Sequence, residues 1–177
     1  MTERLVISGF GGQGIMFLGK LIALAAMRQR KYVTFLPAYG AEVRGGTSHC
    51  AIIISDKEIS SPAAAEIDTL IAMNEPSVVK FLSRLRKGAD IFINGSMAER
   101  PRNLKNCRVQ YIRFSDIALK LGSVKMANMV ALGAYLARKK ILPVKNIIKI
   151  LPEVFKGSLK LARLNEQAIG AGMKEII

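Results

Sequence analysis

The chain has 177 residues, of which 50% are hydrophobic and 23% are charged, and this composition is typical of one compact domain and excludes a disordered chain. Its two cysteines are too few for a framework of disulfides or for an iron–sulfur cluster with four thiolate ligands. So few cysteines also favour a reducing, cytoplasmic location. Lys and Arg number 27 against 13 Asp and Glu, and 15 of the 27 lie in residues 101–177, which indicates either an anionic partner or a solvated basic face.

The chain opens in the order strand, turn, helix, strand. Residues 4–8 form a short apolar run that predicts a buried strand, and the glycine-rich residues 9–14 follow as a turn. Residues 13–29 carry apolar side chains at helical spacing, and residues 32–36 predict a second strand that stops at Pro37. This Rossmann-like βαβ opening is typical of a mostly parallel sheet covered by helices.

The rest of the chain alternates between strands and helices and then becomes helical. Further strands are expected at 50–55, 69–73, 89–94 and 108–114, with a short return strand at 58–60 and a helix that begins at Pro76 and ends before Gly88. Ser115 is expected to cap the first of four later helices, at about 116–121, 125–140, 144–155 and 158–175. Because no repeat or linker divides the sequence, we expect a single α/β domain over residues 1–177, with a mostly parallel sheet flanked by helices and a helical C-terminal third.

The glycine-rich turn is the first motif that points to chemistry. It contains G-x-G-x-x-G between a strand and a helix, where backbone N–H groups and the helix N-terminus can hold a phosphate. The candidate ligand residues are Gly9, Gly11, Gly12, Gln13 and Gly14, with Lys20 on the following helix. The alternative is that the glycines only permit a tight turn and close helix–strand packing. Classical NAD binding is not expected, because no acidic residue ends the second strand.

Residues 37–49 form the least generic segment of the sequence. They place polar side chains and glycines at the carboxyl end of the second strand, which is where ligands bind in open α/β sheets. Glu42 and Arg44 could pair with each other or reach across an interface. The candidate ligand or interface residues are Tyr39, Glu42, Arg44, Gly45, Gly46 and Thr47. The alternative is a surface loop whose polar groups cap the sheet.

The sequence shows no conventional catalytic or metal-binding set. His49 is the only histidine, and its neighbour Cys50 should point to the opposite face of a strand, so a Cys–His dyad is not expected. Neither C-x-x-C nor H-E-x-x-H occurs. We therefore assign no catalytic residue and no metal ligand. Asn128 is a further candidate, because an asparagine within an apolar helical stripe needs a hydrogen-bond partner.

Nucleic acid and membrane are not expected as partners. The sequence has no Trp, 6% aromatic residues and no basic run longer than Arg138–Lys140, which is poor material for base stacking. Its longest apolar stretch, residues 15–27, is interrupted by Lys20 and falls short of the ~20 residues that a bilayer requires.

Three segments, residues 9–14, 39–47 and 128–135, occur together in an order that points to a known family. They resemble the gamma subunit of 2-oxoacid:ferredoxin oxidoreductases, and chain length and motif order match over essentially the whole sequence. The resemblance implies a subunit that is not catalytic alone, in an enzyme that converts a 2-oxoacid and coenzyme A to acyl-CoA, carbon dioxide and reduced ferredoxin.

The same resemblance implies where the cofactors and partners lie. Thiamine diphosphate and iron–sulfur clusters are held largely by alpha, beta and delta subunits, and ferredoxin is an indirect partner. Coenzyme A is the ligand implied for the glycine-rich turn, with Gly9, Gly11, Gly14 and Lys20 at the matching positions. A second hypothesis, from another functional class, is a non-enzymatic binding module for a phosphorylated ligand or an acidic protein.

Overall fold

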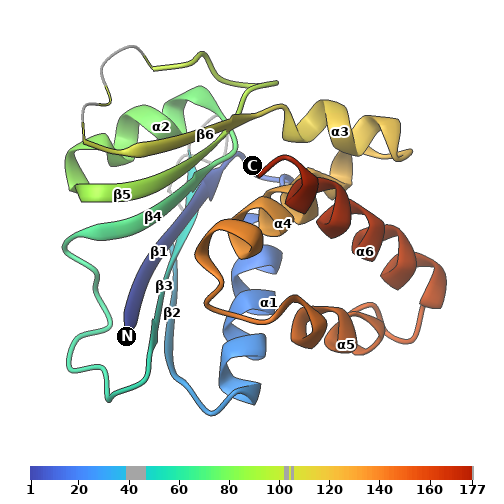
Figure 1. The fold of residues 1–177 in the computed structure, drawn as a ribbon, viewed down its shortest axis with the longest axis horizontal. Helices are drawn as coiled ribbons and strands as arrows, with labels where there is room; N and C mark the ends of the chain where they lie inside the picture. Colours follow the sequence, from blue (N-terminus) through green and yellow to red (C-terminus); the bar gives the residue numbers. More distant parts are fainter. Residues whose placement is uncertain (39–46, 102–103, 105, 177) are drawn as a thin grey trace.

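The fold is a three-layer α/β domain built on one six-stranded sheet (Figure 1). The computed structural model describes all residues except 39–46, 102–103, 105 and 177. The strands lie in the order β2-β3-β1-β4-β5-β6. Their bounds are β1 (Thr2–Gly9), β2 (Tyr32–Ala38), β3 (Ser48–Ser55), β4 (Ile67–Ala72), β5 (Leu85–Asn94) and β6 (Arg108–Ile112).

The sheet is mixed, and its parallel part holds β1, β4, β5 and β6. β3 runs antiparallel to both of its neighbours, β1 and β2. The expected mostly parallel sheet and the β1–α1–β2 opening are therefore present. β1 and β2 run in the same direction, but β3 lies between them, so the opening unit is a split one.

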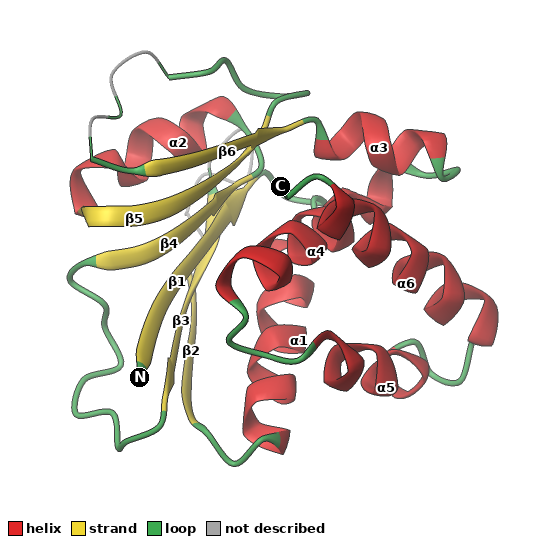
Figure 2. Ribbon diagram, viewed as in Figure 1, coloured by secondary structure: helices red, strands yellow, loops and turns green. Residues whose placement is uncertain are grey.

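Helices cover both faces of the sheet (Figure 2). The helices are α1 (Ile15–Arg28), α2 (Glu75–Phe81), α3 (Phe114–Lys120), α4 (Ala127–Lys139), α5 (Val144–Val154) and α6 (Leu159–Lys174), with short 3-10 turns η1 (Leu82–Arg84) and η2 (Val124–Met126). On the face opposite α2, side chains of α1 and α4 share the larger core with Leu5, Ile7 and Ile52. Because successive strand residues alternate, Val6 and Leu70 instead face α2 on the other side. None of the described helices is long and apolar enough to cross a bilayer.

The helical C-terminal third has the expected order and nearly the expected bounds, whereas four local expectations are wrong. No strand forms at 58–60, and residues 85–88 belong to β5 rather than to the end of a helix. Arg86 is held in that strand by Asp68 of β4, with 2.6 Å between Nε and Oδ1. β2 continues through Pro37 because it is an edge strand, where a missing N–H is tolerated. Ser115 lies inside α3 and does not cap it.

Candidate functional site

The glycine-rich turn lies at the carboxyl end of β1 and leads directly into α1. Gly12 and Gly14 have φ angles of 88° and 71°, in the left-handed region that favours glycine. Gly14 is the N-cap residue of α1 and provides no side-chain cap, so the first N–H groups of the helix stay available to a ligand. A Cβ at Gly11 or Gly12 would meet nothing within 4 Å. The backbone of these two residues is therefore open to an approaching ligand.

Gln13 turns its side chain into the protein. Its Oε1 accepts hydrogen bonds from Phe10 N at 2.7 Å and from Asn74 Nδ2 at 3.3 Å, and its Nε2 donates to Met73 O at 3.4 Å. A Cβ at Gly9 would lie 2.5 Å from Gln13 Oε1. Gln13 therefore braces the turn against Met73 and Asn74, which follow β4, and Gly9 leaves room for the Gln13 side chain. The open backbone is left to Gly11 and Gly12.

A buried polar chain continues from this turn across the carboxyl ends of the parallel strands. Ser77 Oγ donates to Asn74 Oδ1 at 2.7 Å, and Ser8 Oγ donates to Ser77 Oγ at 2.9 Å. Asn94, at the end of β5, donates to Met73 O at 3.3 Å and to Ser115 Oγ at 2.8 Å. Asn74 and Asn94 were not among the candidate residues, although each directly ends or follows a predicted strand at the edge where ligands bind.

Lys125, rather than Lys20, shares a cavity with the turn. Lys125 lies on η2 and lines a small cavity of about 100 Å³ together with Gly12 and Gln13. Lys20 is exposed on α1 and lines neither this cavity nor the larger one beside Gly14. Lys125 carries no signal in the sequence pattern, because its approach to the turn depends on how the α3–α4 connection packs.

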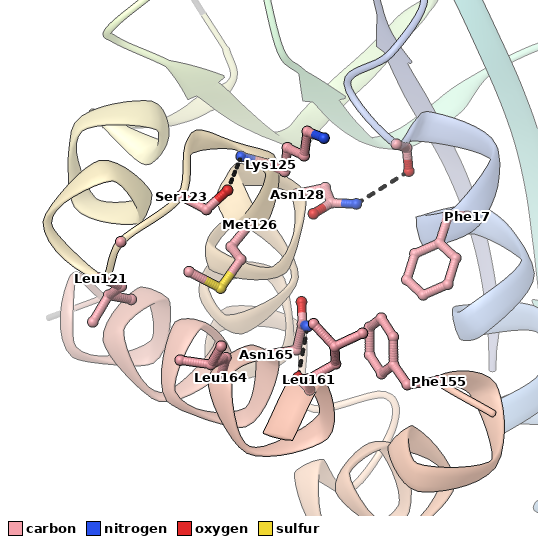
Figure 3. Close-up of a pocket in the computed structure, with 12 residues that line it drawn as sticks. Phe17, Leu121, Ser123, Lys125, Met126, Asn128, Phe155, Leu161, Leu164 and Asn165 are labelled. Carbon is pink, nitrogen blue, oxygen red and sulfur yellow. Dashed lines mark hydrogen bonds between the residues drawn. The ribbon is translucent and has the colours of Figure 1, made fainter. Parts of the chain in front are cut away.

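A larger cavity of about 410 Å³ lies on the Gly14 side of the turn, between α1, the η2–α4 junction and α6 (Figure 3). Asn128 of α4 is 5% exposed at this cavity, and its Nδ2 donates to Gly14 O at 3.3 Å. The expectation that Asn128 needs a hydrogen-bond partner is thus confirmed. A side chain at Gly14 would collide with the Asn128 amide, so the two residues are fitted to each other.

The C-terminal end of the second motif, residues 47–49, lies beside the glycine-rich turn through the β1–β3 pairing. Tyr39, Glu42, Arg44, Gly45 and Gly46 lie outside the described residues. Ser48 pairs with Gly9, which places Thr47 at the same edge of the sheet. Thr47 Oγ1 accepts a hydrogen bond from Lys80 Nζ at 2.9 Å. The described residues at the C-terminal end of the second motif therefore lie beside the start of the glycine-rich turn.

His49 and Cys50 lie on opposite faces of β3, as expected. The His49 ring packs against Phe81 with 5.0 Å between ring centroids, and burial together with Lys80 and Arg84 lowers the pKa of His49. Cys50 Sγ instead contacts Ile15 O at 3.7 Å, and burial raises the pKa of its thiol to about 12. The thiol therefore stays protonated at neutral pH, and this pair does not form a dyad.

A cluster of buried carboxylates, Glu3, Asp68 and Asp90, lies at the opposite end of the parallel strands. Asp90 binds Arg108 at 2.8 Å, and Arg138 and Lys139 at 3.2 Å each. Burial alone would raise the pKa of Asp90, but hydrogen bonds from these three cations lower it to about 2. Because every carboxylate of the cluster has a cationic partner, we interpret the cluster as structural.

Comparison with known proteins identifies the family to which the chain belongs. Residues 4–175 match the family Pyruvate ferredoxin/flavodoxin oxidoreductase. Ketoisovalerate oxidoreductase subunit VorA from Methanothermobacter thermautotrophicus is 33% identical over 96% of this chain and 35% of the relative. This chain therefore spans about a third of the length of VorA.

Two solved structures share the fold. The gamma subunit of a keto/oxoacid ferredoxin oxidoreductase from Geobacter sulfurreducens has a TM-score of 0.83 and 26% identity, covering 98% of this chain and 97% of the other. A 2-oxoglutarate:ferredoxin oxidoreductase from Magnetococcus marinus, with 2-oxoglutarate, coenzyme A and succinyl-CoA bound, has a TM-score of 0.88 and 21% identity, covering 98% of this chain and 31% of the other. With its family match over nearly the whole length, this chain belongs to the pyruvate ferredoxin/flavodoxin oxidoreductase family.

Proposed function

We propose that this chain is the gamma-type subunit of a multi-subunit 2-oxoacid:ferredoxin oxidoreductase and is not catalytic alone. The observation that carries the proposal is the two-way match to the Geobacter gamma subunit, in which each chain covers nearly all of the other. The alpha, beta and delta subunits would hold thiamine diphosphate and the iron–sulfur clusters. This chain would contribute subunit contacts, and ferredoxin would be an indirect partner in the cytoplasm.

We further propose that the glycine-rich turn holds a phosphate of coenzyme A. The open backbone of Gly11 and Gly12, the free N-terminus of α1 and the Lys125 ammonium suit an anion. The Magnetococcus enzyme, which has the same fold over one part of its chain, binds coenzyme A. Lys20 stays a candidate phosphate ligand from the sequence. Gly14, as the N-cap residue, sets the direction in which α1 begins.

A non-enzymatic binding module remains the second candidate function. It is favoured by five exposed cations on α5, α6 and the turn between them: Lys145, Lys149, Lys156, Lys160 and Arg163. None of these cations has an ion-pair partner among the described residues. Such a surface suits an acidic protein or a phosphorylated ligand.

The test of both proposals is reconstitution with the alpha, beta and delta chains. The lone chain should not reduce a viologen dye with any 2-oxoacid and coenzyme A, whereas the assembled enzyme should. In the assembled enzyme, Gly12→Asp should raise KM for coenzyme A at least ten-fold, because two unit charges ~4 Å apart repel by about 4 kcal/mol at an effective dielectric near 20. KM for the 2-oxoacid should change much less.

Two outcomes would contradict these proposals, and they are separable. A lone chain that reduces the dye, or one that never assembles with the partner chains, contradicts the subunit assignment. An assembled Gly12→Asp enzyme with unchanged dependence on coenzyme A contradicts the phosphate site alone, and would show that the glycines serve packing.

A further inference from the structure

The larger cavity has the size and lining of a small-molecule site. Its volume is about 410 Å³, and it opens beside the first turn of α1 (Figure 3). Most of its wall is apolar and comes from Phe17, Leu121, Met126, Phe155, Leu161 and Leu164. Sites of this kind bind the apolar body of a ligand, while a few polar groups set its orientation.

Four polar residues, Ser123, Lys125, Asn128 and Asn165, interrupt the apolar wall, and the two asparagines are buried. Asn128 of α4 is 5% exposed and Asn165 of α6 is 7% exposed. Nδ2 of Asn128 donates to Gly14 O at 3.3 Å, and Nδ2 of Asn165 donates to Leu161 O at 2.8 Å. Because both acceptors are carbonyl oxygens, the orientation of each amide is fixed by chemistry. Each Oδ1 must then point away from the carbonyl that its own nitrogen binds.

Both amide oxygens lack a donor among the described residues. Neither is sealed inside the protein, so both can be reached from the cavity. Figure 3 shows the Asn165 oxygen turned away from the Leu161 carbonyl and toward Asn128. Polar atoms on residues this buried are nearly always hydrogen-bonded. Because both oxygens are accessible from the cavity, a ligand that enters it can supply these donors in place of water.

We propose that this cavity binds a largely apolar small molecule that donates N–H or O–H hydrogen bonds to Asn128 and Asn165. The two carbonyl oxygens accept hydrogen bonds, so they select an N–H or O–H donor on the ligand, whereas Lys125, which also lines the cavity, can donate to an acceptor group of the same ligand. Every residue of the site belongs to this chain. The inference therefore does not depend on the proposed role as a subunit.

The test compares two probes of nearly the same shape on the full chain. Benzamide carries an N–H donor group, whereas methyl benzoate presents the same ring without one. Titration followed by NMR should show benzamide shifting the side-chain amide signals of Asn128 and Asn165. Benzamide should bind about five-fold more tightly than methyl benzoate, the ratio expected for one net hydrogen bond. Equal affinity, or unshifted amide signals at saturation of the probe, would overturn the proposal and leave a cavity filled by water.

A matched pair of variants then locates the effect. Asn165→Leu should weaken benzamide binding about five-fold and leave methyl benzoate unchanged or tighter. Gln167→Leu makes the same chemical change at an exposed position of α6 and should alter neither affinity. An equal loss of benzamide affinity in both variants would overturn the site. If Asn165→Leu does not fold, the two-probe comparison on the unmodified chain still decides.

Discussion

At the scale of single residues, the glycine-rich turn contains two kinds of glycine. Gly14 has a left-handed φ of 71°, is the N-cap of α1 and lies directly against the Asn128 amide. Gly11 has none of these constraints, and a Cβ there would stand in open space. The G-x-G-x-x-G pattern alone does not separate these roles. Gly14 is needed by the protein itself, whereas Gly11 leaves room for whatever approaches the turn.

Gly14→Ala should therefore destabilise the lone chain far more than Gly11→Ala. The left-handed backbone costs an alanine about 1 kcal/mol, and displacement of Asn128 adds ~1–2 kcal/mol. Gly11→Ala should change the free energy of unfolding by less than about 0.5 kcal/mol. Urea unfolding of both variants measures the difference. Equal losses of unfolding free energy would contradict the distinction between the two glycines.

Asp90 makes the stability of the chain depend on pH. Its pKa is about 2 in the folded protein, below the ordinary value of 3.8. The unfolded chain therefore binds this proton more readily, so the contribution of Asp90 is complete above about pH 5 and is lost as the pH falls toward 2. Glu3 acts in the opposite direction, because burial raises its pKa above 4.5 despite the hydrogen bond from Thr69 and the charge of Lys139.

Comparison of the unmodified chain with Asp90→Asn isolates this effect. The variant should be less stable by about 3 kcal/mol at pH 7, because Lys139 and Arg138 each lose a buried partner. The gap between the two unfolding free energies should narrow as the pH falls from 5 toward 2. A gap that stays constant over this range would contradict the lowered pKa of Asp90.

At the scale of elements, hydrophobic periodicity predicted the helices, which depend on local sequence, but not the order of the strands, which depends on pairing between distant segments. The C-terminal helices α4, α5 and α6 were expected nearly at their observed bounds, because their apolar residues repeat at helical spacing. The insertion of β3 between β1 and β2 was not predictable, because strand order follows from tertiary pairing. Likewise, the glycine-rich turn was recognised as a candidate site, but Lys125 reaches it only through the packing of η2.

The contact between α4 and α6 also depends on residues that periodicity does not distinguish. A Cβ at Gly133 of α4 would strike the backbone of Ile169, and one at Gly172 of α6 would strike the backbone of Val130. Gly170, on the same helix α6, faces open space. The two buried glycines therefore let the helix backbones touch, and this contact sets the position of Asn128 relative to Asn165 across the cavity.

The glycines of this contact should respond to alanine with opposite signs. Gly133→Ala should lower the free energy of unfolding by about 2–4 kcal/mol, because the helices must move apart. Gly170→Ala should raise it by up to about 1 kcal/mol, since alanine is the better helix former and nothing obstructs its methyl group. Thermal or urea unfolding distinguishes them, and a stabilising Gly133→Ala would refute the close packing of α4 on α6.

At the scale of the whole molecule, charge is unevenly distributed even after ion pairing. Buried Glu3, Asp68 and Asp90 are neutralised at one end of the sheet. Lys145, Lys149, Lys156, Lys160 and Arg163, here called the α5–α6 basic segment, keep their charges exposed and have no acidic partner among the described residues. If partner subunits dock on this segment, their approach should be steered by its field.

Reversal of charge in the α5–α6 basic segment should therefore slow assembly in a salt-dependent way. Lys149→Glu combined with Lys160→Glu should lower the association rate with the partner subunits about ten-fold at low salt, and the loss should shrink at about 0.5 M salt, where screening is strong. The control pair is Lys57→Glu with Lys87→Glu, two exposed lysines outside the segment that change the net charge equally. Stopped-flow association measures both pairs. If the control slows association as much as the segment pair does, then total charge governs assembly and the location of these lysines does not.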